Sequence, residues 1–194
     1  MLFLNLAVYA VVCIIILCLI EIYAVIAYIF EARAMYTMAA KRNIPRPWLS
    51  YVPVANSWIL GKIADDYEER ANGAAPRHAK RLVCLKIILL AVLVVFYIIL
   101  VAVFAVAAAS VSFGAEAGTL FSGNDFVVLA FLCVLPVAAA FLYEVFSYIA
   151  LYKVYRSCSP SKTSLYFTLS VLFGIAPFLM FSVREKTEGL LAGE

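Results

Sequence analysis

Long apolar runs divide this chain and predict its architecture. A helix needs about 20 apolar residues to cross the hydrocarbon core of a bilayer. Four runs are long enough: residues 2–30, 82–109, 126–152 and 165–183. The fourth is the shortest, and Gly174 and Pro177 interrupt it. The pattern therefore predicts an all-α integral membrane protein, one membrane domain over residues 1–194 with four transmembrane helices.

A second kind of apolar segment covers residues 44–63, which are aromatic and too rich in proline to span. Pro47 suits the first turn of a helix, where its missing N–H costs nothing, and Pro53 would bend that helix. Trp48 and Tyr51 are typical of the membrane–water interface. We expect an interfacial or re-entrant helix here, which either anchors the protein at the surface or lines a cavity. The membrane-interface candidates are Pro47, Trp48, Tyr51, Pro53, Asn56 and Trp58.

Basic residues predict the orientation. The loop 31–81 holds nine Lys and Arg residues, the loop 153–164 holds three, and the loop 110–125 holds none. The positive-inside rule places the first two loops in the cytoplasm and the N-terminus outside. Two cations in the C-terminal tail 184–194 disagree with a fourth full span, and a re-entrant fourth segment would return this tail to the cytoplasm. We favour the full span.

Composition excludes several classes of protein. The chain is 66% hydrophobic and 14% charged, far from the values of about 45–50% and about 25% in soluble domains. Its net charge of +3 gives no reason to expect nucleic acid as a partner. The five cysteines form no CxxC pair, and we interpret them as small apolar residues, with no metal or cofactor expected.

An acidic stretch follows the aromatic segment. Residues 65–70 hold four carboxylates, and residues 72–76 contain Gly73 and Pro76. We interpret these residues as a solvated acidic turn and a flexible linker, because the spacing lacks the ligands and the glycine of a calcium loop.

Two carboxylates within the apolar runs are the strongest candidates for chemistry. Glu21 and Glu144 each interrupt a span, and an ionisable group at membrane depth usually faces protein or water. At 1.5 Å per helical residue, Lys86 can reach the depth of Glu144, with Glu21 deeper. These three residues are candidates for ion or proton binding. The alternative is that they pair with one another or with tyrosines and hold helices together.

Signals for an enzyme are weak. His78 is the only histidine, and it lies in the linker that precedes the second span. Neither HExxH nor GxSxG occurs in the chain. We therefore assign no catalytic residue and expect no enzyme.

Part of the chain resembles a known group of proteins. Residues 40–65 contain Pro-Trp-Leu, a second Pro, Asn and Leu-Gly, followed by an acidic residue, and residues 152–158 and 176–184 add a second stretch. This pattern is similar to small bacterial polytopic membrane proteins of unknown function, in which an Asp-Pro often stands where this chain has Ser159-Pro160. The resemblance implies a multi-pass protein of the bacterial cell membrane, and it supplies no activity.

Two functions remain open after the sequence. In the first, the protein is a non-enzymatic membrane module that docks a partner protein or lipid headgroups through its basic loop and interfacial helix. In the second, it is a small transporter or channel that binds protons or cations at its membrane-embedded glutamates. Small-residue patches at 105–109 and 138–140 make a homo-oligomer plausible in either case. We narrowly favour the docking module, because four helices leave little room for a pore.

Overall fold

The computed structural model describes residues 2–73, 77–112 and 123–186. In chain order its helices are α1 (Leu2–Lys41), the 3-10 helix η1 (Pro47–Tyr51), α2 (Ala55–Asn72), α3 (His78–Ser112), α4 (Gly123–Cys158), the 3-10 helix η3 (Pro160–Lys162), α5 (Thr163–Phe173) and α6 (Ala176–Val183). No strand occurs in these ranges, which confirms the predicted all-α class. Most of the predicted external loop 110–125 and of the tail 184–194 lies outside the described residues.

Three of the predicted spans are present as long helices. The stretches Ile15–Lys41, His78–Val103 and Cys133–Cys158 are long and apolar enough to cross a membrane. The helix α1 continues eleven residues past the predicted end at Phe30. Residues 31–41 include Ala, Met, Glu and Lys, which favour helix, and contain neither Gly nor Pro. Pro136 lies inside α4.

The predicted fourth span is not confirmed. Residues 165–183 are divided between α5, with 11 residues, and α6, with 8 residues. Gly174 separates them with a left-handed φ of 63°, and its N–H donates to the Ser170 carbonyl. Pro177 occupies the first turn of α6. Each helix is much shorter than the roughly 20 residues that a span requires.

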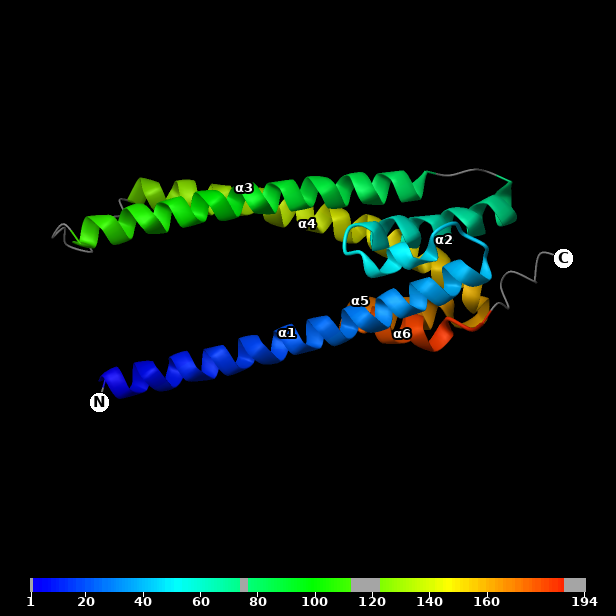
Figure 1. The fold of residues 1–194 in the computed structure, drawn as a ribbon, viewed down its shortest axis with the longest axis horizontal. Coiled ribbons are helices and arrows are strands. Elements are labelled where there is room, and N and C mark those ends of the chain that lie inside the picture. The colour runs from blue at the N-terminus through cyan, green and yellow to red at the C-terminus, as the bar shows by residue number, and fades with distance from the viewer. Residues whose placement is uncertain (1, 74–76, 113–122, 187–194) are drawn as a thin grey trace.

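Most of the tight packing lies at one end of the molecule (Figure 1). There the C-terminal part of α1 packs on α6, η1 and α2, and α2 also packs on α3 and α4. The largest fully buried side chains belong to this region: Tyr155, Met35, Met38, Ile59 and Met180. We call residues 27–72, 77–89 and 143–186 the packed layer.

Away from the packed layer, the long helices separate. Figure 1 shows α3 and α4 side by side, while α1 diverges from them toward its N-terminus. Every side chain from residue 15 to residue 26 of α1 is exposed. These side chains are almost all apolar, as expected of surface that faces lipid tails.

The acidic stretch is a helix and not the solvated turn that we predicted. Residues 65–70 belong to α2, which ends at Asn72 and is capped by Gly73, and residues 74–76 of the predicted linker lie outside the described residues. Asp65 is only 8% exposed, and its carboxylate accepts hydrogen bonds from the backbone N–H groups of His78 and Ala79. These N–H groups at the start of α3 have no partner within the helix, so a carboxylate there stabilises it.

Close backbone contact between α2 and α3 brings Asp65 to the start of α3. A Cβ atom on Gly61 would lie 2.4 Å from the Cα of Ala79, so only glycine allows this approach of α2 to α3. The absence of a side chain at position 61 therefore fixes the distance between the two helices.

A buried arginine holds the end of α1 in the packed layer. Arg42 donates to the Ile63 carbonyl on α2 at 3.1 Å and to Ser157 Oγ on α4 at 2.6 Å. Asp66 Oδ2 lies 3.6 Å from its guanidinium. Burial lowers the pKa of Arg42, because a charged group is less stable away from water. These polar partners offset the cost of burying the charge.

Candidate functional site

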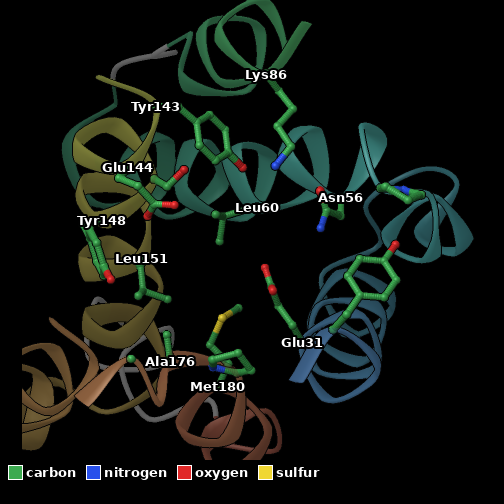
Figure 2. A pocket seen from close by; sticks show the side chains of 15 residues that line it. Glu31, Asn56, Leu60, Lys86, Tyr143, Glu144, Tyr148, Leu151, Ala176 and Met180 are labelled. Carbon is green, nitrogen blue, oxygen red and sulfur yellow. The ribbon is translucent and has the colours of Figure 1, made fainter. Parts of the chain in front are cut away.

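A cavity of about 420 Å³ lies where α1, α2, α3, α4 and α6 meet. Figure 2 shows Glu31, Lys86 and Glu144 on different sides of it, with α2 across the back of the view. Its lining residues are Tyr28, Glu31, Pro53, Asn56, Leu60, Lys86, Tyr143, Glu144, Ser147, Tyr148, Leu151, Gly174, Ala176, Pro177 and Met180. Three charged side chains from three helices thus share one hollow.

The charged groups of the cavity are not paired with one another. Over the described residues, neither Glu31 nor Glu144 makes an ion pair or a side-chain hydrogen bond, and Lys86 Nζ lies 4.3 Å from the centre of the Tyr143 ring. Lys86 attracts the charge of Glu31 and Glu144 repels it. With both carboxylates ionised, the cavity holds one cation and two anions.

All three charges lie within candidate spans at a similar depth. Glu31 is ten residues from the end of α1 at Lys41, which corresponds to about 15 Å along the helix. Lys86 is eight residues, or about 12 Å, from the start of α3. Glu144 is nine residues, or about 14 Å, from Lys153 on α4. Unpaired charges at such depth are expensive and typically mark functional sites.

Aromatic and polar groups complete the lining. The hydroxyl of Tyr28 donates to the Tyr51 carbonyl at 2.8 Å, and Tyr143 shares a hydrogen bond of 2.9 Å with Ser57. The hydroxyl oxygen of Ser147 is buried and has no hydrogen-bond partner. Tyrosine rings attract cations through the negative charge on their faces. The lining therefore suits a positively charged guest better than an anion.

A second charged cluster lies nearby in the packed layer, and its members are fully paired. Lys153 Nζ on α4 lies 2.5 Å from Glu68 Oε1 on α2 and 2.6 Å from His78 Nε2 on α3. Glu68 Oε2 also lies 3.0 Å from His78 Nε2. The hydrogen bond from Lys153 is the main reason that the pKa of Glu68 is lowered. We call Glu68, His78 and Lys153 the helix-linking cluster, because they join three helices.

The sequence-predicted ion candidates separate into two groups. Glu144 and Lys86 line the cavity together. Glu21 does not line it, and is exposed on α1, ten residues before Glu31. The distance along the helix, about 15 Å, is too long for Glu21 to act on a guest held by Glu31.

Two of the interface candidates line the cavity. Pro53 and Asn56 stand at the turn before α2 and in its first residues, and both face this space. Trp58 is partly buried against the core, with Lys62 Nζ 5.9 Å from its ring centre.

The other interface candidates lie on η1. Pro47 occupies its first turn, as predicted. Trp48 is 57% exposed and Tyr51 is 48% exposed, so both rings remain free to contact lipid headgroups or a partner.

Sequence reasoning missed Glu31, because it placed this residue at the start of the first cytoplasmic loop. Since α1 continues to Lys41, Glu31 lies inside a span. The helix-favouring residues 31–41 are the signal that could have extended the helix. Tyr28, one turn earlier on the same side of α1, could then have indicated a polar face.

Comparison of the chain with protein-family models, curated proteins and solved structures gives no significant match.

Proposed function

We propose that this protein is a small transport protein that binds a cation or a proton in the cavity between its helices. The observation that carries the proposal is that Glu31, Lys86 and Glu144, from three different helices, surround one cavity without pairing. A site with two carboxylates and one ammonium has zero net charge once one cation or proton has entered. Neutrality is strongly favoured inside the hydrocarbon core.

The residues have distinct roles in this proposal. Glu31 and Glu144 bind the cation or share the proton, since two carboxylates that face one space cannot both ionise cheaply. Lys86 lowers the net charge of the site, so that one entering cation is enough to make it neutral. The Tyr143 ring beneath its ammonium supplies an alternative surface for either cation.

The sequence favoured the docking module, and the cavity is our reason to prefer transport. A docking module requires no hollow that reaches charged groups. The exposed Trp48 and Tyr51 remain suited to the interface in both functions, and a homo-oligomer is compatible with both.

The arrangement of α5 and α6 fits the same proposal. Together they form a re-entrant hairpin with its turn at Gly174, and the turn lines the cavity. Non-helical backbone at membrane depth is tolerated where it lines a cavity. The chain then crosses the bacterial cell membrane three times, with the N-terminus outside and the packed layer at the cytoplasmic side.

Flux measurements in proteoliposomes test the proposal. We expect proton or monovalent-cation flux from the wild type, and a loss of most of it in Glu31→Gln and Glu144→Gln. The matched control is Glu21→Gln, which changes the same residue type on the same helix outside the cavity and should keep the flux. Absence of flux above empty liposomes, together with no cation binding to the detergent-solubilised protein, would contradict the proposal.

A further inference from the structure

We infer that the guest of this cavity is an amphiphile with a cationic headgroup, which reaches Glu31 and Glu144 sideways from the bilayer, between α1 and the α3–α4 pair. This inference rests on the proposed function and names the chemical class of its ligand. It follows from the surfaces that lead to the cavity and from those that close it.

The helix faces that line the cavity continue as apolar, uncovered surface. Seven residues make nearly two helical turns, so positions seven apart share a face to within about 20°. On the side away from the packed layer, the residues seven positions from the three charged ones are apolar. They are Ala24 for Glu31, Leu93 for Lys86 and Val137 for Glu144. All three are exposed, Leu93 by 44% and Val137 by 67%. An apolar tail matches these walls.

Nothing on the described helices covers these faces. The helix α1 packs on α6, η1 and α2, while α3 packs on α4 and α2, and the contact of α1 with α4 through Met38 and Cys158 lies within the packed layer. Figure 1 shows the separation of α1 from the other two spans widening toward its N-terminus. A chain molecule of the bilayer can therefore lie beside the cavity.

The opposite side offers no comparable passage. The helix α2 crosses behind the cavity in Figure 2, with Leu60 and Asn56 on its wall. Next to Leu60, Gly61 lies so close to Ala79 that not even a methyl group fits between α2 and α3. A ligand thus meets packed helices on this side and open apolar faces on the other.

The cavity has the volume and charge for a cationic headgroup and the adjoining part of its tail. Its size of about 420 Å³ falls at the lower end of small-molecule sites, which are about 300–1,000 Å³. Two carboxylates and three tyrosine rings line it, and aromatic rings with carboxylates are how proteins recognise organic ammonium groups. The rest of the tail then remains between the helices, in contact with lipid.

A series of n-alkylamines from butylamine to dodecylamine tests the inference. Binding to the full chain in lipid nanodiscs is measured by titration calorimetry, and the signal from a Glu31→Gln/Glu144→Gln double variant is subtracted to remove partition into lipid. With the tail in an apolar environment, the Kd referred to free aqueous amine should fall about fourfold for each added methylene. A Kd that does not change with chain length would overturn the inference and leave the proposed cation site intact.

Blocking the route gives an independent readout. Ala24→Trp places a large ring on the face of α1 that leads to Glu31, and should weaken dodecylamine binding at least tenfold while butylamine binding is unchanged. The control Ile22→Trp lies nine residues from Glu31, on the opposite side of α1, and should change neither. Equal weakening of both amines by Ala24→Trp would overturn the lateral route, because it indicates a general disturbance of the site.

Three further outcomes bear on this inference and on the proposed function. If no amine binds but proton flux is still lost in the Gln variants, the site is a proton site and the amphiphile is wrong. If Ala24→Trp converts a dimer in nanodiscs into a monomer, a second copy of the chain occupies the space between the helices, and the inference is also wrong. If neither flux nor binding occurs, both proposals fail.

Discussion

Two clusters in this molecule contain the same chemistry and differ in their pairing. In the helix-linking cluster, the ammonium of Lys153 lies within 2.6 Å of both Glu68 and His78. In the cavity, Lys86 lies over a tyrosine ring, and Glu31 and Glu144 line the cavity without an ion pair. Both clusters draw their residues from three helices.

The difference suggests how to distinguish a structural cluster of charged residues from a ligand-binding one in a membrane protein. A paired cluster has its desolvation cost offset within the fold, so it holds helices together and has no capacity left for a ligand. In an unpaired cluster, the desolvation cost is not offset until a ligand binds. The helix-linking cluster therefore stabilises the packed layer, whereas the cavity cluster binds the guest in the proposed function.

The physical origin of the difference is the distance between helices. At the helix-linking cluster, α2 and α3 approach to backbone contact through Gly61. At the cavity, the backbone of α1 packs mainly on α6, η1 and α2 and stays farther from α3 and α4. Side chains of similar length thus meet in the first place and not in the second.

The largest expected effect comes from separating α2 and α3. Gly61→Ala places a Cβ 2.4 Å from the Cα of Ala79, and the backbone cannot yield without displacing Asp65 and Glu68. We expect the free energy of unfolding in mixed detergent micelles to fall by about 3 kcal/mol. The control Ala71→Gly makes the reverse exchange of the same two residue types at an exposed position of the same helix, and should cost only about 1 kcal/mol. An unchanged stability for Gly61→Ala would show that the close contact is absent.

The next prediction exchanges the two lysines for methionine. Lys153→Met leaves Glu68 without its strongest partner and should cost about 2 kcal/mol, as for hydrogen bonds to charged groups. Lys86→Met removes a residue without an ion pair and should cost only about 0.5 kcal/mol. The two variants are compared by unfolding in mixed micelles and by flux in proteoliposomes. Flux should change in Lys86→Met and persist in Lys153→Met. Equal stability losses would remove the distinction between the clusters.

A smaller effect is expected at the start of α3. Asp65→Ala removes the acceptor of two backbone N–H groups and should cost about 1 kcal/mol, as for other helix caps. Asp65→Asn keeps one oxygen acceptor and should recover part of the loss. Hydrogen exchange of the amides of His78 and Ala79 provides the local readout. If these amides exchange at the same rate in Asp65→Ala, the carboxylate does not cap the helix.

The smallest effect is a pH dependence of the helix-linking cluster. The pKa of Glu68 is lowered from its ordinary value of 4.5, chiefly by the hydrogen bond from Lys153. Its ionised form therefore stabilises the fold above that ordinary value, and this contribution is lost as the pH falls through the lower folded-state pKa. The difference in the free energy of unfolding between wild type and Glu68→Gln should shrink as the pH falls from about 6 to about 3, the range over which one carboxyl group titrates. A difference that stays constant would show that Glu68 is not paired.

Much of the architecture was readable from the order of residues alone. A run of about 20 apolar residues has no stable place in water, and its backbone must bond to itself in lipid. The three spans follow directly from this local requirement. Gly174 and Pro177 were also visible as interruptions, but we favoured a full span there, and the structure has two short helices instead. The depth match of Lys86 and Glu144 also followed from helical rise.

Only the tertiary structure decided which charges meet. Glu21 and Glu31 look alike in the sequence, and the first is the more conspicuous because apolar residues surround it. Yet Glu31 lies where α1 packs on α6, η1 and α2 and lines the cavity, whereas Glu21 is exposed and does not line it. Asp65 and Glu68 likewise appeared solvated, until the contact of Gly61 with α3 placed them against His78. Local pattern determines where a helix forms, whereas the contacts between helices, which depend on residues far apart in the chain, determine what each side chain faces.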